Sequence, residues 1–117
     1  MQRKTPKLLE DIRGAAAFIL EIAKNKSLAD YQGDRTFRSA VERNFEIMGE
    51  AIRRLVREDL ETAGHIGDYP QIIAFRNVLI HGYDLIDDER VWTTINKDLA
   101  PLVANVEALL RDEEKQT

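Results

Sequence analysis

The sequence predicts an all-α protein, folded as an antiparallel bundle of four or five helices. Apolar residues recur three and four positions apart through most of the 117-residue chain, which is the spacing of one helix face. The alternation of apolar and polar residues that is typical of strands is nearly absent. The three prolines and six glycines lie where helices would start or stop. No repeat or linker interrupts the pattern, so we expect a single domain over residues 1–117.

The composition places the chain among globular proteins, with 44% apolar and 32% charged residues and a formal charge of −4. The absence of cysteine excludes disulfides, thiolate zinc sites and a cysteine nucleophile, and it favours a reducing compartment. The longest apolar run, residues 15–20, is too short to span a bilayer. A pI near 5.2 argues against a general affinity for nucleic acid. We therefore expect a cytoplasmic protein with no membrane contact, in which any RNA-binding surface is local.

The first predicted helix begins at Thr5, which we expect to be its N-cap, with Pro6 at the first helical position. The pattern frays over residues 25–27. Residues at helical spacing predict one buried face: Leu8, Leu9, Ile12, Ala16, Ile19 and Ala23.

A turn over residues 32–34 leads into the second helix, which is predicted to be the longest. Asp34 is its candidate N-cap, and Gly64 and Gly67 lie beyond its end. A sustained apolar stripe predicts that this helix is central to the core: Phe37, Val41, Phe45, Met48, Ile52 and Leu55.

The third predicted helix is short. It starts between Asp68 and Pro70, because proline is favoured in the first turn of a helix. It ends at about Gly82, since glycine suits the left-handed residue that often follows a helix.

The last predicted helix is capped by Asp87 or Asp88. Pro101 lacks a backbone N–H and is expected to kink or divide this helix near Leu99. Its apolar residues again recur at helical spacing: Val91, Ile95, Leu99, Leu102, Val106 and Leu109.

Arg76 is the anomaly of the third predicted helix. All four of its neighbours on the same helix face are apolar: Ile72, Ile73, Leu79 and Ile80. An arginine in such surroundings needs an anion or a partner chain, because an uncompensated buried charge is costly. An ion pair with Glu46 or Glu50 of the second helix is the simplest explanation, and a phosphate-binding role is the alternative.

The residues that follow Arg76 favour the alternative, a phosphate-binding role for Arg76. Asn77 is positioned to orient a phosphate or a neighbouring side chain, and His81 lies at the expected helix end, where exposed carbonyls favour the imidazolium. His81 converges with Arg76 only if the helix terminates there. Cleaving RNA without a metal requires a group of near-neutral pKa that moves protons and a cation that stabilises the phosphorane. His81 and Arg76 are residues of these two types, although a histidine at a helix end is more often a cap.

Residues 76–83 read RNVLIHGY, that is, an arginine, four residues, a histidine, any residue and a tyrosine. This segment resembles the motif of the HEPN ribonucleases, in the version found in HepT toxins. Residues 43–51 of the second predicted helix, RNFEIMGEA, add to the resemblance, which covers most of the chain. It implies a HEPN-like helical bundle.

The resemblance also implies a function. It implies a metal-independent RNA endonuclease toxin that leaves 2′,3′-cyclic phosphate and 5′-hydroxyl ends, with Arg76, His81 and Asn77 as catalytic residues and no cofactor. Glu46 and Glu50 are candidate auxiliary residues. The implied partner is a minimal nucleotidyltransferase antitoxin, which transfers AMP from ATP to Tyr83 and so neutralises the toxin. A symmetric homodimer is expected, since a two-fold axis supplies each site with a second histidine.

No other polar residues are assigned a chemical role. His65 lies in a glycine-bounded loop, and two histidines do not make a closed metal site. Helix capping and solvation explain one acidic cluster better than cation binding does: Asp84, Asp87, Asp88 and Glu89. Six arginines predict a solvated face, or alternatively part of an RNA groove: Arg35, Arg38, Arg43, Arg53, Arg54 and Arg57.

Two other functions remain open from the sequence. One is a non-catalytic helical subunit that binds a nucleotidyltransferase or a nucleotide, with Arg76 holding phosphate and His81 structural. The other is a purely structural helical bundle. If activity requires His81 while binding, measured separately, does not, the protein is a ribonuclease and neither a non-catalytic subunit nor a purely structural bundle.

Overall fold

The computed structural model describes residues 2–81 and 87–116, without the side chains of residues 81 and 116. Within these ranges the chain forms six helices and no strand, which confirms the all-α prediction. The helices are α1 (Thr5–Ala23), α2 (Leu28–Gly33), α3 (Arg35–Glu58), α4 (Leu60–Ala63), α5 (Tyr69–His81) and α6 (Asp88–Gln116).

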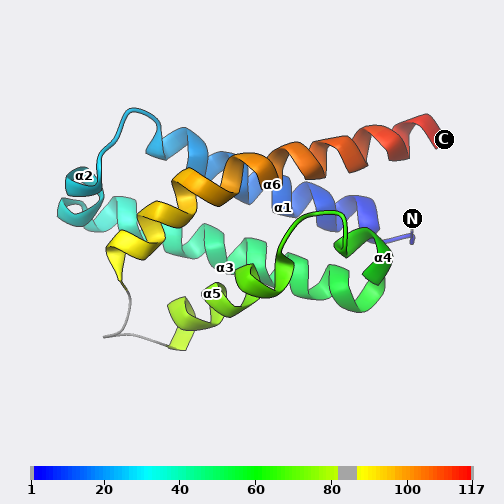
Figure 1. Cartoon of the computed structure of the whole chain (residues 1–117), viewed down its shortest axis with the longest axis horizontal. Helices are drawn as coiled ribbons and strands as arrows, with labels where there is room; N and C mark the ends of the chain where they lie inside the picture. The colour runs from blue at the N-terminus through cyan, green and yellow to red at the C-terminus, as the bar shows by residue number, and fades with distance from the viewer. Residues whose placement is uncertain (1, 82–86, 117) are drawn as a thin grey trace.

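Four of these helices, α1, α3, α5 and α6, make the bundle (Figure 1). α1 packs against both α3 and α6, and α5 packs against α3. The short α2 covers one end of the bundle, between α3 and α6, and the short α4 follows α3 at the other end, near the N-terminus. No helix within the described ranges is long and apolar enough to cross a membrane.

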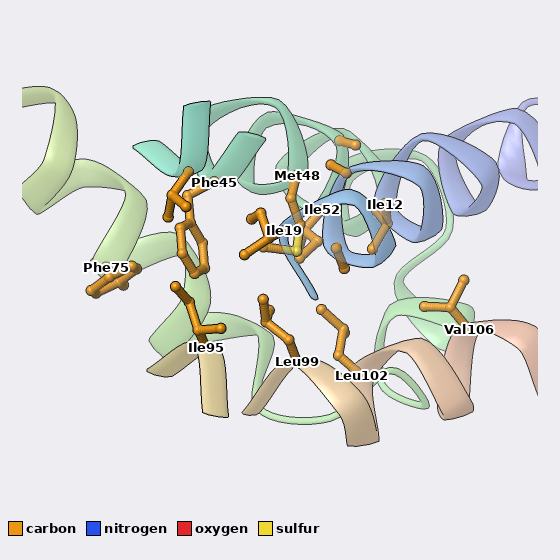
Figure 2. Close-up of a cluster of buried hydrophobic side chains, with 14 of the residues drawn as sticks. Ile12, Ile19, Phe45, Met48, Ile52, Phe75, Ile95, Leu99, Leu102 and Val106 are labelled. Atoms are coloured by element: carbon orange, nitrogen blue, oxygen red, sulfur yellow. The ribbon is translucent and has the colours of Figure 1, made fainter. Parts of the chain in front are cut away.

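The core lies between α1, α3 and α6, with a smaller contribution from α5 (Figure 2). The three predicted apolar stripes are buried except for Leu109, which is partly buried; Ile12, Ile52 and Leu99 are each at most 1% exposed. Phe75 extends the core to α5, where its ring meets that of Phe45 edge to face at 4.9 Å between centroids. This aromatic contact fixes α5 on α3.

Thr5 is not the N-cap of α1. Lys4 occupies that position without a side-chain hydrogen bond. The Thr5 hydroxyl instead donates to Asp59 Oδ2 at 2.8 Å. Asp59 also accepts from the Thr62 N–H and hydroxyl and from the Gln2 N–H, at 3.2, 2.8 and 3.2 Å. We call these four residues the Asp59 cluster; it ties the start of α1 to the junction of α3 and α4, 54 residues away along the chain.

The second predicted helix is not the longest, because Pro101 does not divide the last one. α6 runs for 29 residues with Pro101 inside it, against 24 for α3. Proline removes one backbone hydrogen bond, while Leu99 and Leu102 on either side are buried in the core. Burial of this continuous apolar face outweighs the single lost bond.

The predicted caps of the second and last helices fit the observed helix starts. Asp34 accepts the Phe37 N–H at 3.1 Å and caps α3, and Asp87 accepts the Glu89 N–H at 3.0 Å before α6. Sequence reasoning missed α2, which begins with a capping box between Ser27 and Asp30. It also missed α4, which Asp59 caps.

An aromatic cluster joins α2, α3 and α6 at the end opposite α4. Tyr31 of α2 is fully buried, and its ring lies 5.2 Å from Phe37 and 5.7 Å from Trp92 between centroids. Among the described residues, the Tyr31 hydroxyl has no hydrogen-bond partner. Burial is the main reason that the pKa of Tyr31 is raised, so the phenol is neutral at any physiological pH.

Candidate functional site

The candidate site is built on α5, the helix predicted to carry the chemistry. Asp68 precedes the helix and accepts the Gln71 N–H at 3.4 Å, so α5 begins inside the predicted range. Phe75 packs on Phe45 and thereby fixes the rotation of α5 against α3. Because successive residues turn by about 100°, the next side chain, Arg76, meets α3 beside this contact.

Gly49 of α3 leaves room for the side chain of Arg76 against the backbone of α3. A Cβ atom at position 49 would lie 2.6 Å from Arg76 Cγ and 2.7 Å from its Cβ. The aliphatic part of Arg76 therefore rests directly on the backbone of α3. Sequence reasoning missed this role, although a glycine inside a long amphipathic helix was a usable signal, since it costs about 0.5–1 kcal/mol relative to alanine.

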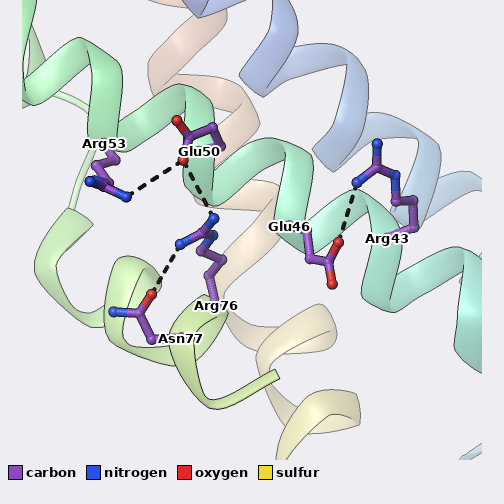
Figure 3. A network of polar contacts seen from close by, with 6 residues as sticks. All are labelled: Arg43, Glu46, Glu50, Arg53, Arg76 and Asn77. Atoms are coloured by element: carbon purple, nitrogen blue, oxygen red, sulfur yellow. Dashed lines mark hydrogen bonds and ion pairs between the residues drawn. The ribbon is translucent and has the colours of Figure 1, made fainter. Parts of the chain in front are cut away.

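The guanidinium of Arg76 has two hydrogen bonds (Figure 3). Nη2 donates to Glu50 Oε2 at 3.4 Å, and Nη1 donates to Asn77 Oδ1 at 3.1 Å. The Arg76 side chain is 17% exposed, whereas that of Glu50 is 45% exposed. Nε is buried and has no partner among the described residues. Arg76 is thus nearly buried but incompletely neutralised.

Of the two carboxylates predicted as partners, Glu50 is the one that pairs with Arg76. Its Oε2 also lies 3.9 Å from Arg53 Nη1, so it is shared between two arginines. Glu46, one turn earlier, pairs instead with Arg43 at 3.3 Å. The placement of α5 opposite Gly49 selects Glu50.

An open groove of about 300 Å³ lies beside Arg76, between α1, α3 and the end of α5. Its apolar wall includes Leu8, Ile47 and Ile80. Its charged lining is mixed in sign: Asp11, Arg43, Glu46, Glu50, Arg54 and Arg76. A polyanion meets no extended basic surface here, so binding of a phosphate has to depend on individual arginines.

Two predicted site residues are only partly visible or not visible at all. α5 is described as far as His81, but the side chain of His81 is outside the described part of the chain, as are residues 82–86 that follow it. Tyr83 and Asp84 also lie outside the described residues. The convergence of His81 with Arg76 and the placement of Tyr83 remain predictions.

The remaining polar candidates have structural explanations. His65 is exposed in the loop between α4 and α5, and no group of three metal-binding side chains occurs among the described residues. Arg38 donates to the backbone carbonyls of Tyr31 and Gln32 and so holds α2. Three other arginines of α3 are exposed and pair with glutamates: Arg43, Arg53 and Arg57. Arg43 and Arg54 also line the groove beside Arg76.

Residues 12–109 match the family described as HepT-like, ribonuclease HepT-like. This range includes α5 and the two residues that hydrogen-bond to Arg76, Glu50 and Asn77.

Several named proteins are similar along nearly their whole length. A protein named "putative RNase" from Caldanaerobacter subterraneus subsp. tengcongensis is 32% identical over 111 residues, or 94% of this chain and 98% of its own. A "probable ribonuclease HepT" from Thermococcus cleftensis is 29% identical over 109 residues, covering 93% of this chain and 98% of that one. A "putative RNase" from Methanocaldococcus jannaschii is 26% identical over 111 residues, covering 95% and 91%. No solved structure matches the chain significantly.

Proposed function

Because this chain belongs to the HepT-like family of ribonucleases, we propose that it is a metal-independent RNA endonuclease that acts through Arg76 and His81. Asn77 is the third residue of the proposed site. It accepts a hydrogen bond from Arg76 Nη1 and so orients the guanidinium.

One observation carries the proposal, namely the unfinished hydrogen bonding of Arg76. A guanidinium has five N–H donors, and the described residues engage two of its nitrogens, one of them only at 3.4 Å. Arginine is rarely buried without full pairing. Arg76 lines an open groove, and a transient phosphate there can use the N–H donors of its two Nη atoms that Glu50 and Asn77 leave free.

The proposed reaction is a transesterification. The 2′-hydroxyl attacks the adjacent phosphorus, the bond from phosphorus to O5′ breaks, and the products are a 2′,3′-cyclic phosphate and a 5′-hydroxyl. His81 acts in proton transfer at these oxygens, because imidazole gains and loses a proton near neutral pH. Arg76 stabilises the extra negative charge of the phosphorane. Glu50 keeps the guanidinium in place without consuming all its donors.

We propose that the active form is a symmetric homodimer. The reaction needs a base at the 2′-hydroxyl and an acid at O5′, yet the second histidine of the chain, His65, lies in a loop beyond the opposite end of α5. A two-fold axis through the ends of the α5 helices brings a second His81 to the site. A monomer in light scattering that is fully active contradicts this assembly.

Regulation by nucleotide transfer completes the proposal. A minimal nucleotidyltransferase partner attaches AMP to the Tyr83 hydroxyl, two residues from His81. The added phosphate repels the RNA phosphate and competes for Arg76, and the purine blocks the site sterically. Intact mass spectrometry with this partner and ATP tests the step: we expect one AMP on the wild type and none on Tyr83→Phe. Equal labelling of both proteins contradicts it.

RNA cleavage in the presence of a chelator tests the enzymatic proposal. His81→Ala is expected to lower the rate by about 10²–10⁴-fold through loss of acid and base catalysis, while His65→Ala, the matched control, leaves it unchanged. Equal cleavage by the wild type and His81→Ala contradicts the mechanism, as does a strict requirement for magnesium. RNA binding that needs Arg76 without any cleavage indicates the alternative, a non-catalytic subunit.

A further inference from the structure

A second hollow lies between α5 and α6, on the other side of α5 from the groove beside Arg76. We call it the α5–α6 hollow. Its floor is apolar and includes Phe45, Phe75, Leu99 and Leu102; Figure 2 shows Phe45 beside Phe75, with Leu99 and Leu102 extending from α6. Its volume is about 150 Å³. Drug-sized ligands occupy roughly 300–1,000 Å³, so this hollow has room for one small ring system.

The rim of the hollow carries polar side chains from a single face of α6. Arg90, Thr94 and Asp98 follow one another at intervals of four residues and all line it. The Arg90 guanidinium lies 5.5 Å from the centroid of the Phe75 ring, a cation–π distance. Among the described residues, no hydrogen bond or ion pair engages the carboxylate of Asp98. The hollow therefore combines an aromatic floor with a free acceptor.

The charges at the rim select the kind of ligand. Asp68 and Asp98 place two carboxylates against the one guanidinium of Arg90. A phosphate or carboxylate is repelled by this arrangement. A neutral, planar ring with an exocyclic amine at its edge is complementary to it, because the ring covers apolar carbon and the amine reaches a carboxylate.

The exposed face of α5 connects the hollow with Arg76. Gln71 lines the hollow, Ala74 is small and exposed one turn later, and Asn77 is exposed and bonded to Arg76. Gln71 and Asn77 are about 9 Å apart along the axis, at 1.5 Å per residue. An RNA strand that follows this exposed face of α5 can therefore place one nucleotide at Arg76 and a neighbouring one at the hollow.

We propose that the α5–α6 hollow binds the base of a nucleotide next to the scissile phosphate and prefers a base with an exocyclic amine. The inference rests on the proposed ribonuclease function. Cytosine places its N4 amine where Asp98 accepts a hydrogen bond. Uracil, of the same size, presents the O4 carbonyl to that carboxylate, and two acceptors repel each other. The hollow thus discriminates cytosine from uracil.

Nucleoside binding to the intact protein tests the hollow without any cleavage. In ¹⁵N-resolved NMR titrations, cytidine is expected to shift the amides of Gln71, Thr94 and Asp98 at concentrations at least about threefold lower than uridine does. Thr94→Leu fills the hollow and should abolish these shifts, whereas Thr93→Leu, an exposed neighbour outside the hollow, preserves them. Equal binding of the two nucleosides, or full binding to Thr94→Leu, overturns the proposal.

Asp98→Asn sharpens this test, since its amide donates to a carbonyl where the carboxylate only accepts. The preference should move towards uridine; an unchanged preference overturns the proposal.

A cleavage assay separates the base preference from the ribonuclease function. On matched oligonucleotides with cytosine or uracil beside the cut, Thr94→Leu should still cleave but lose the preference of the wild type. A preference that persists in Thr94→Leu overturns the assignment of the hollow. If the wild type cleaves no RNA in chelator while cytidine still shifts the hollow amides, the ribonuclease proposal fails and the base-binding hollow stands.

Discussion

Two charged groups lie at junctions between helices, and they differ in how completely they are hydrogen-bonded. Asp59 is 9% exposed and accepts four hydrogen bonds from the other three residues of the Asp59 cluster. Arg76 is 17% exposed, yet it has one long ion pair, one hydrogen bond to Asn77 and a buried Nε without a partner in the described part of the chain.

The difference separates a structural charge from a candidate functional one. A charge that stabilises a fold is fully hydrogen-bonded, because each missing bond costs free energy. A charge that binds substrate has to keep donors free until the substrate arrives, and the fold accepts that cost. Changes at Asp59 should therefore alter stability, and changes at Arg76 should alter activity.

The largest expected effect is that of Arg76→Lys on RNA cleavage. Lysine keeps the charge but loses the planar fork of donors, so we expect the rate to fall by about 10²–10³-fold, with less than ~1 kcal/mol of change in unfolding free energy. Single-turnover cleavage and urea denaturation measure the two quantities. Arg53→Lys is the control, since Arg53 also contacts Glu50 but is exposed. Cleavage by Arg76→Lys at more than half the wild-type rate makes Arg76 a structural residue.

Asp59→Ala should produce the reverse pattern. It leaves the hydroxyls of Thr5 and Thr62 and two backbone N–H groups without their acceptor. We expect a loss of about 3 kcal/mol in unfolding free energy, with unchanged cleavage per folded molecule. Urea denaturation measures the loss, and Asp112→Ala, an exposed carboxylate of α6, should cost less than ~0.5 kcal/mol. A cleavage defect in fully folded Asp59→Ala contradicts the distinction between a structural Asp59 and a functional Arg76.

The stabilisation by Asp59 should depend on pH in a defined window. Burial alone raises the pKa of this carboxyl, but hydrogen bonds from Thr5, Thr62 and Gln2 outweigh burial and lower the pKa to about 2. The unfolded chain has an ordinary Asp pKa of about 3.9. Because the folded pKa is the lower one, the stabilisation is complete above pH 4 and is lost as pH falls from about 4 to about 2.

Denaturation curves of the wild type and Asp59→Asn measure this loss. The difference between their unfolding free energies should shrink by about 2–3 kcal/mol across that window. A difference that stays constant down to pH 2 shows that the charge of Asp59 contributes nothing.

The smallest effects compare two glycines inside helices. Gly49→Ala places a methyl group against Arg76, so we expect a loss of about 1–2 kcal/mol together with slower cleavage. At Gly14, nothing lies within 4 Å of an added Cβ, and Gly14→Ala should stabilise the protein by about 0.5–1 kcal/mol without affecting cleavage. Thermal denaturation and cleavage rates measure both. Equal gains in stability would mean that α5 does not depend on its close approach to α3.

Local patterns predicted most of the fold. The apolar spacing of the long helices is a property of neighbouring residues, and so are caps such as Asp34. The two missed helices, of six and four residues, are too short to show a helical period and depend on Ser27 and Asp59 as caps. Thr5 carries the local signature of an N-cap, but its actual partner is 54 residues distant and has no local signal.

The candidate site was predictable as a list of residues and not as a geometry. Arg76 is anomalous in the sequence because its helix neighbours are apolar. The choice of Glu50 over Glu46, and the role of Gly49, depend on how α5 is rotated and seated on α3. That seating comes from the contact between Phe45 and Phe75, which are 30 positions apart in the sequence.

The aromatic cluster of Tyr31, Phe37 and Trp92 gives the protein an intrinsic optical probe. Trp92 is the single tryptophan of the chain, so its emission reports one place, the junction of α2, α3 and α6. Trp92 follows the first turn of α6, close in sequence to the segment that contains Tyr83. Its fluorescence therefore offers a label-free signal for following, in real time, events at this end of the molecule.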